Sequence, residues 1–419
     1  MNKNILAGFA IAAAVGLAGG CAHDHHAQHH MEPPAGGGFA PERLARMEAV
    51  VQADIARGRI PGAVLVVYRN GEVVLNKAYG VQDPASGKPM RIDSIFRIYS
   101  MTKPIVTVAA MMLVEEGRLF LSDPVSKHIP ELKGLKVGVE TKDTTGKPVL
   151  EIVAAQREMT VQDLMRHTSG LTYGVFGKSM VKDLYTSNKV DASDHSNAEL
   201  VKKLAGVPLH YQPGTTWEYG RSTDVLGHVI ERVTGMDLDR VLEERILKPL
   251  GMRDTAFFAE PAKHSRLAEA FAKDSDSGAA IDLLKVKEKP RYLAGGQGMV
   301  STAGVYLRFA QMLLNGGQLD GVRIVSRKTV EYMASDHLGA IRGPAPGYGF
   351  GLGFAVRTGA GVASTPGTVG DYNWAGLGGT YFWIDPRERL IAIWMMQAPN
   401  QRTYYRELYR DMVYGAMSR

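Results

Sequence analysis

The chain has 419 residues, of which 45% are hydrophobic and 22% are charged, and its formal net charge is +6. This composition is typical of a globular protein that is large enough for a sizeable core and two lobes. Lysine and arginine are interspersed with aspartate and glutamate and form no long basic run. The charge pattern therefore argues against a nucleic-acid-binding protein.

The first twenty residues have the pattern of an export signal. Lys3 supplies a positive start, residues 5–17 an apolar stretch, and Ala18-Gly19-Gly20 a small-residue cleavage site. The single cysteine, Cys21, follows directly, at the place where a bacterial lipoprotein carries its lipid, although Ala18 stands where leucine is commonest. No disulfide can form within the chain. We expect an exported, periplasmic protein that is anchored to the membrane only through lipid on Cys21, and simple secretion is the alternative.

Residues 21–40 have the composition of a tether. Five histidines lie between positions 23 and 30, and two prolines and a run of three glycines follow. The histidines could bind zinc, nickel or copper, but acidic and cysteine partners at ligand spacing are nearly absent. We therefore expect a solvated tether, and we assign no metal site and no cofactor. The folded domain is expected over residues 41–419.

The folded part begins with a helix and a hairpin. Apolar residues recur at helical spacing over residues 41–56, and Pro41 suits the first turn of a helix. Two β-rich runs, 62–68 and 73–79, then flank Asn70-Gly71, which is a strong hairpin signal.

Ser100-Met101-Thr102-Lys103 places a hydroxyl and an amine three residues apart, on one face of a helix. A serine becomes an effective nucleophile when a neighbouring base accepts its proton, and a lysine can be that base in apolar surroundings. The apolar run 105–114 predicts a buried helix that starts close to Ser100, has Pro104 in its first turn and ends near Gly117. The start of a helix also favours developing negative charge. The alternative is a helix cap with a surface lysine.

Two other patterns contain a serine but lack this context. Ser179-Met180-Val181-Lys182 has the same spacing, but it lies among polar residues, where we expect Lys182 to be exposed and protonated. His167-Thr168-Ser169 sets a histidine near a serine, but no carboxylate that would orient the histidine is evident, which favours a structural loop. The chain also lacks Gly-x-Ser-x-Gly and the common nucleotide-binding and zinc-protease motifs.

β-rich runs lie towards both ends of the chain, and helical patterns fill the middle. A second hairpin is predicted over residues 380–395, and a final helix over 404–417. The intervening helical patterns cover 160–166, 223–234, 237–247 and 302–314. We expect an α+β fold, in which helices flank an antiparallel sheet built from both termini and a mainly helical lobe is inserted. The α/β lobe would comprise about residues 41–98 and 290–419, the helical lobe about 99–289, and the substrate cleft would lie between them.

Four stretches resemble, in order, the landmarks of the serine β-lactamase and penicillin-binding-protein superfamily. They are residues 96–104, 164–171, 295–302 and 374–380. The similarity spans about residues 41–415, and the chain looks closest to the class C-like branch that contains the family VIII carboxylesterases. The resemblance implies a β-lactamase/DD-peptidase-like fold and a serine acyl-enzyme mechanism, with Ser100 as nucleophile and Lys103 as its proton acceptor.

The same resemblance implies roles for Tyr219 and for two backbone groups. Tyr219 would be the catalytic tyrosine, which passes a proton between Ser100 and the leaving group. The oxyanion hole would consist of the backbone N–H groups of Ser100 and Leu377. Gly376 and Gly378 would place no side chains beside these donors.

The chain departs from the β-lactamase pattern at two positions. Arg221 replaces the asparagine two residues after the tyrosine, while the nearby Asp224 resembles the esterase branch. Trp374-Ala375-Gly376 replaces the Lys-Thr-Gly whose lysine helps to bind the carboxylate of β-lactams and peptidoglycan stems. Losing such a charge-assisted hydrogen bond costs about 1.5–3 kcal/mol, or roughly 10- to 150-fold in affinity. A neutral ester would lose nothing, so the substitution favours an esterase.

We therefore expect a serine hydrolase that cleaves small-molecule carboxylic esters, with weak hydrolysis of β-lactam-like substrates. Its substrate site would include Arg221 and Trp374-Ala375-Gly376. Three alternatives stay open. A β-lactamase or D-Ala-D-Ala carboxypeptidase would use Arg221 as the missing cation, an acyltransferase would use the same catalytic residues, and a surface lipoprotein that binds peptidoglycan or metal would have no turnover.

Overall fold

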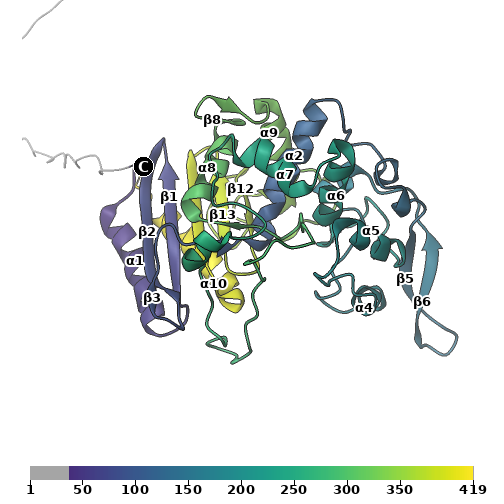
Figure 1. Ribbon diagram of the computed structural model, residues 1–419, viewed down its shortest axis with the longest axis horizontal. Coiled ribbons are helices and arrows are strands. Elements are labelled where there is room, and N and C mark those ends of the chain that lie inside the picture. Colours follow the sequence, from purple (N-terminus) through teal and green to yellow (C-terminus); the bar gives the residue numbers. More distant parts are fainter. Residues whose placement is uncertain (1–36, 419) are drawn as a thin grey trace, which may run out of the picture. The chain divides into compact units, whose positions relative to one another are not determined.

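The computed structural model describes residues 37–418, and Figure 1 shows their arrangement. An antiparallel sheet of eight strands lies at the centre of this part. The strands are β1 (Gly62–Arg69), β2 (Glu72–Asp83), β3 (Lys88–Pro89), β10 (Tyr348–Phe350), β11 (Ala355–Arg357), β12 (Tyr372–Ala375), β13 (Tyr381–Asp385) and β14 (Leu390–Met396). Their order in the sheet is β10-β11-β12-β13-β14-β1-β2-β3. The predicted α+β fold, with a sheet built from both ends of the domain, is confirmed.

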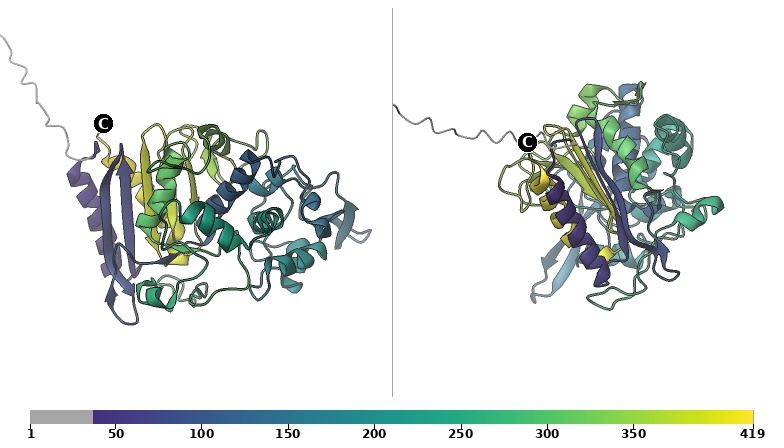
Figure 2. Two further views of the ribbon diagram at one scale, coloured as in Figure 1. Left: turned by 45° about the horizontal axis from the view of Figure 1, so that its top comes forward. Right: turned by 90° about the vertical axis from the view of Figure 1, so that its left-hand side faces the viewer.

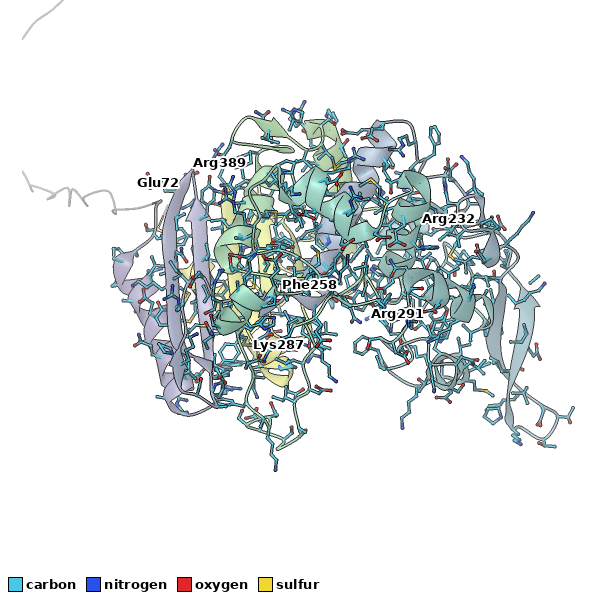
Figure 3. The ribbon with its side chains drawn as sticks, in the orientation of Figure 1. Glu72, Arg232, Phe258, Lys287, Arg291 and Arg389 are labelled. Carbon is cyan, nitrogen blue, oxygen red and sulfur yellow. The ribbon has the colours of Figure 1, made fainter. Side chains whose placement is uncertain are left out.

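Both predicted hairpins are present at the centre of the sheet. β1 and β2 are joined by Asn70 and Gly71, whose φ angles of 54° and 93° are in the left-handed region that tight hairpin turns require. β13 pairs with β14, and β14 pairs along its other edge with β1. The turns of the two hairpins lie side by side, because the N–H of Asn70 donates to the carbonyl of Arg389. Figure 3 shows Glu72 and Arg389 together at this end of the sheet.

Helices cover both faces of the sheet. On one face, α1 (Pro41–Ala56) packs beside α10 (Arg402–Ala416), as the purple and yellow helices of Figure 2 show. The other face is covered by α8 (Ala303–Leu314), which packs against β1, β13 and β14, and α2 (Thr102–Glu115) belongs to the same apolar core. Alternate residues of β1 contribute to the two apolar layers, so this strand is buried on both faces. The sequence predicted the start and end of α1 because its apolar residues and its first-turn proline are local signals.

The middle of the chain is mainly helical. Its helices are α3 (Val161–Met165), α4 (Met180–Ser187), α5 (Asn197–Ala205), α6 (Ser222–Thr234) and α7 (Leu238–Leu242), and one π-helical turn (Glu243–Leu247) follows α7. The chain also contains α9 (Arg327–Met333) and the short strands β4 (Phe96–Arg97), β7 (Val300–Ser301), β8 (Gln318–Leu319) and β9 (Val322–Arg323). A hairpin of β5 (Lys136–Lys142) and β6 (Pro148–Ala154) was not predicted. The described residues all belong to one compact unit, and the boundaries of the two lobes stay a prediction.

The packed chain begins earlier than the predicted tether allows. Phe39 is fully buried and bridges to Met417, and the N–H of Ala40 donates to the carbonyl of Ala416 over 2.8 Å. Phe39 and Ala40 therefore belong to the packed domain and not to the predicted tether. The predicted export signal, Cys21 and the histidines lie outside the described residues. Within residues 37–418, no helix is long and apolar enough to cross a membrane, and no cluster of His, Cys, Asp and Glu could hold a metal ion.

Candidate active site

Ser100 lies in a 3₁₀ turn (Tyr99–Met101) that leads directly into α2. The helix therefore starts where the sequence predicted, and Pro104 stands in its first turn, where the missing N–H costs no helical hydrogen bond. Tyr99 has a φ of 44°, a left-handed conformation that few residues other than glycine adopt. The N–H groups at the start of a helix have no partner within the helix, so they are available to a substrate.

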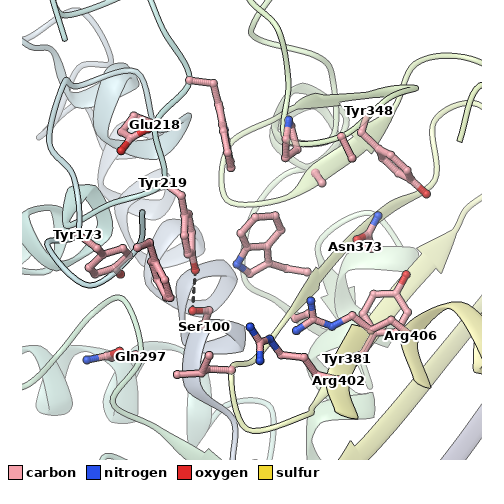
Figure 4. A pocket seen from close by; sticks show the side chains of 18 of the residues that line it. Ser100, Tyr173, Glu218, Tyr219, Gln297, Tyr348, Asn373, Tyr381, Arg402 and Arg406 are labelled. Atoms are coloured by element: carbon pink, nitrogen blue, oxygen red, sulfur yellow. Dashed lines mark hydrogen bonds between the residues drawn. The ribbon is translucent and has the colours of Figure 1, made fainter. Parts of the chain in front are cut away.

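Two side chains donate to the hydroxyl of Ser100. The hydroxyl of Tyr219 donates to Ser100 Oγ over 2.6 Å, as the dashed line in Figure 4 shows. Nζ of Lys103 donates to the same oxygen over 3.2 Å. Lys103 is only 1% exposed, and its amine lies 4.5 Å from the centre of the Tyr219 ring. The structure thus brings the three predicted catalytic residues into direct contact.

Two further groups hold the amine of Lys103. It donates to the carbonyl of Gly296 over 2.7 Å and to the hydroxyl of Tyr173 over 3.3 Å. Gly296 is itself fixed, because its N–H donates to the carboxylate of Asp224 over 3.0 Å. A Cβ at Gly296 would lie 2.8 Å from that carboxylate, so this close approach requires glycine. Asp224 therefore positions Lys103 through the backbone, and Tyr173 is a contact that sequence reasoning missed.

Arg221 lies behind the site, and its charge is neutralised within the protein. It is 2% exposed, and its guanidinium lies 2.8 Å from the carboxylate of Asp191 and 3.6 Å from that of Asp224. It also donates to the hydroxyl of Tyr292 over 3.3 Å. Arg221 reaches the pocket wall, as predicted. Because two carboxylates already balance its charge, it would attract the carboxylate of a substrate only weakly. This geometry therefore argues against the alternative of a β-lactamase or peptidase that uses Arg221 as the missing cation.

The end of β12 forms the opposite side of the site. Trp374 and Ala375 line the pocket, while Gly376 is buried behind them. A Cβ at Gly376 would clash with the hydroxyl of Thr380 and with the carbonyl of Ile98, two residues before Ser100. Glycine at this position lets the strand end close against the turn that carries the nucleophile.

Leu377 follows at the rim, and its geometry is compatible with the predicted oxyanion hole. The side chain lines the same pocket as Ser100. Its backbone N–H has no acceptor among residues 37–418, and the N–H of Ser100 belongs to the first turn of its helix. Two such donors can stabilise the negative charge that develops on a carbonyl oxygen during acyl transfer.

The pocket in front of Ser100 encloses about 880 Å³. This volume is in the range of pockets that bind small organic molecules. Its aromatic lining residues are Tyr173, Phe176, Trp217, Tyr219, Tyr348, Trp374 and Tyr381. An apolar acyl or alcohol group therefore has a wall of rings to pack against.

Lys182, the lysine of the second Ser-x-x-Lys pattern, is more buried than predicted, but its amine makes no hydrogen bond to the hydroxyl of Ser179. Ser179 caps α4, where its Oγ accepts from the backbone N–H of Lys182 over 3.1 Å. The Lys182 side chain is 13% exposed and lies 3.0 Å from the carboxylate of Glu218. Burial would raise the pKa of Glu218, but hydrogen bonds from His210, Thr172 and Lys182 lower it to about 2. Lys182 is therefore held as an ion pair, not as a base.

His167 is a buried packing residue. Its ring lies 5.0 Å from that of Tyr219 and 5.5 Å from that of Phe350. Neither ring nitrogen has a hydrogen-bond partner in the part of the chain that the structure describes. A catalytic triad needs a carboxylate on one of these nitrogens and the serine on the other. The geometry agrees with the predicted structural loop.

Residues 47–414 match the model of the beta-lactamase family. Protein Rv1367c of Mycobacterium tuberculosis is 35% identical, over 81% of this chain and 86% of its own length. Esterase EstB of Burkholderia gladioli is 32% identical, over 85% of this chain and 90% of its own length.

A solved structure is similar over nearly the whole described part. It is that of EstCE1, a hydrolase with promiscuous acyltransferase activity, with a TM-score of 0.74 and 27% identity. The match covers 89% of this chain and 98% of EstCE1. The chain therefore belongs to the beta-lactamase family and is an enzyme of its serine-hydrolase type.

Proposed function

We propose that this protein hydrolyses small carboxylic esters through an acyl-enzyme on Ser100. The observation that carries the proposal is the pair of hydrogen bonds from Lys103 and Tyr219 to Ser100 Oγ, at the floor of an aromatic pocket. An ester as substrate is supported by the relatives, since EstB is an esterase and EstCE1 a hydrolase.

In the acylation step, Ser100 Oγ attacks the ester carbonyl carbon, and its proton passes to Nζ of Lys103, which has to enter this step as the uncharged amine. The carbonyl oxygen becomes negatively charged and faces the N–H groups of Ser100 and Leu377, each worth roughly 3–4 kcal/mol in the transition state. The carbon–oxygen bond to the alcohol then breaks. The departing alkoxide takes the proton of the Tyr219 hydroxyl, which regains a proton from Lys103.

In the deacylation step, water attacks the acyl carbon, and its proton passes through the Tyr219 hydroxyl to the amine of Lys103. The bond to Ser100 Oγ breaks, and the serine regains its proton from the same pair. An alcohol in place of water would give a new ester. The promiscuous acyltransferase activity of EstCE1 makes this transfer a second candidate function.

Hydrolysis of p-nitrophenyl butyrate by the full chain and by Ser100→Ala tests the proposal, with nitrocefin as a β-lactam substrate. We expect ester turnover that disappears in Ser100→Ala, and little cleavage of nitrocefin. Dominant nitrocefin cleavage would replace the esterase with a β-lactamase. The absence of turnover on both substrates would favour a peptidase or a binding lipoprotein. Ester formation from added benzyl alcohol measures the transfer activity.

We also propose that the chain is exported and carries lipid on Cys21. The sequence pattern around Cys21 supports this localisation. Radiolabelled palmitate should be incorporated into the wild-type chain in the producing bacterium and not into Cys21→Ser. Equal labelling of both chains, or none of either, would contradict the lipid anchor.

A further inference from the structure

Helix α10 presents three arginines to the pocket in front of Ser100. Arg402, Arg406 and Arg410 recur at intervals of four residues, so they lie along one face of the helix. All three line the pocket. Figure 4 shows Arg402 and Arg406 pointing into it, toward the side where Ser100 lies.

Arg410 is neutralised by the protein. It forms an ion pair with the buried carboxylate of Asp371 and donates to the hydroxyl of Tyr381 over 3.0 Å. The same carboxylate also pairs with Arg357 over 2.7 Å. This arginine therefore belongs to a structural network and is not free for a ligand.

Arg402 and Arg406 have no such partner. Within residues 37–418, no carboxylate lies in ion-pair distance of either guanidinium. Arg406 donates to the carbonyl of Gly376 over 3.0 Å, and its buried Nε has no partner in the described part of the chain. Arg402 donates to the carbonyl of Pro399. Both contacts are with neutral groups, so neither positive charge is balanced.

Burial makes these two charges costly. Desolvation and the neighbouring charge of Arg402 lower the pKa of Arg406 to about 10, and burial also lowers the pKa of Arg402. Both guanidinium groups stay protonated at neutral pH. Two like charges that are withdrawn from water without a counter-ion are unfavourable, and an anion bound between them would relieve the penalty of both.

The carboxylates of the pocket wall do not supply that anion. Asp191 pairs with Arg221, and Glu218 pairs with Lys182. Glu407 is exposed to solvent and makes no ion pair with any described residue. The charge that is left unbalanced around Ser100 is therefore positive.

Two further hydrogen-bond donors lie in the same wall. Nδ2 of Asn373 and Nε1 of Trp374 are buried, and neither has an acceptor within residues 37–418. Such donors at a pocket wall can be satisfied by a ligand, although the core residues Trp383 and Trp394 also lack an acceptor among the described residues. Donors and positive charge together match the oxygen atoms of a carboxylate.

We propose that Arg402 and Arg406 form a carboxylate subsite, so that the preferred ester substrate carries a free carboxylate in addition to its scissile bond. The inference rests on the proposed function, because it takes Ser100 as the acylated residue. It revises the expectation of a neutral ester. The cation that replaces the missing motif lysine comes from the last helix of the chain and not from Arg221.

Two pairs of esters test the subsite on the full chain. Mono-p-nitrophenyl adipate and methyl p-nitrophenyl adipate differ by a charge on the acyl side. Meta-butanoyloxybenzoate and its methyl ester differ by a charge on the alcohol side. Each kcat/KM is divided by the rate constant for uncatalysed hydrolysis of the same ester. We expect the charged member of at least one pair to be preferred by about 10- to 150-fold.

Variants connect this preference to the two arginines. Arg402→Gln and Arg406→Gln should each bring the ratio of charged to neutral ester towards one, and Arg406→Lys should keep part of it. Arg240→Gln removes the same charge from an exposed position of α7 and should keep the wild-type ratio. Circular dichroism checks that each variant is folded.

Inhibition gives a measurement that needs no variant. Adipate should compete with p-nitrophenyl butyrate for the wild-type enzyme at least about tenfold more strongly than dimethyl adipate. Equal kcat/KM within both ester pairs together with equal inhibition, or a preference that survives both glutamine variants, would overturn the subsite alone. The absence of turnover on all four esters and on p-nitrophenyl butyrate would overturn the proposed function and the subsite with it.

Discussion

Replacing Tyr219 with phenylalanine removes one atom, the hydroxyl oxygen that lies 2.6 Å from Ser100 Oγ. The ring should keep its place, because it packs 5.0 Å from His167 and 5.4 Å from Trp374. The 3.2 Å contact from Lys103 to Ser100 also stays. The substitution therefore removes proton transfer to the leaving group without opening the pocket.

The size of the effect follows from the role of the phenol. A positioned general acid contributes about 10²- to 10⁴-fold in rate, or roughly 3–5 kcal/mol of the barrier. An alkoxide needs a proton to leave, whereas p-nitrophenolate leaves readily without one. We expect Tyr219→Phe to lower kcat for ethyl butyrate by about 10²- to 10⁴-fold. The loss for p-nitrophenyl butyrate should be smaller, and KM should change little for either ester.

Titration of released acid at constant pH measures both esters. Tyr173→Phe is the matched control, since its hydroxyl contacts Lys103 at 3.3 Å but does not contact Ser100. It should cost less than about tenfold, because the proton path through Tyr219 is intact. A kcat for ethyl butyrate within about tenfold of wild type in Tyr219→Phe, or equal losses in the two variants, would refute the role of Tyr219.

Three further predictions concern the lysine, the strand end and acid stability. Lys103→Ala should abolish ester turnover while circular dichroism stays normal, and full turnover in a folded variant would remove Lys103 from the mechanism. Gly376→Ala should lower kcat by about 10²-fold or more, because the new Cβ clashes with Thr380 and Ile98 and displaces an oxyanion donor; a fully active variant would contradict this steric argument. Burial would raise the pKa of Asp163, but hydrogen bonds from two arginines, the Thr168 hydroxyl and the Thr160 backbone N–H lower it from 3.8 to about 2. The carboxylate therefore contributes about 2 kcal/mol that is fully present above its ordinary pKa and is lost as the pH falls towards 2. Thermal melting from about pH 5 to 2 should show this loss in the wild type and a flatter decline in Asp163→Asn, and parallel curves would argue against it.

Local signals predicted the parts of the fold that depend on neighbours in sequence. The helix after Ser100, the turn at Asn70-Gly71 and the first helix at Pro41 each follow from spacing, glycine or proline within a few residues. The contact between Ser100 and Lys103 belongs to this class, since one helical turn separates them.

Contacts between distant segments could not be predicted in the same way. Arg221 was assigned to the substrate because nothing in its neighbourhood showed that Asp191, thirty residues earlier, would neutralise it. Lys182 was expected to be exposed because its partner Glu218 is far along the chain. The two free arginines of α10 stand some three hundred residues after Ser100, and an amphipathic helix with several arginines gives no sign of which ones lack a counter-ion.

The acyl-enzyme itself tests the central claim most directly. The full chain is mixed with p-nitrophenyl butyrate, quenched with acid during turnover, digested and examined by mass spectrometry. The account predicts one butanoyl group on the peptide that contains Ser100, and no such group in Ser100→Ala. A butanoyl group on another residue, or ester turnover that persists in Ser100→Ala, would contradict it.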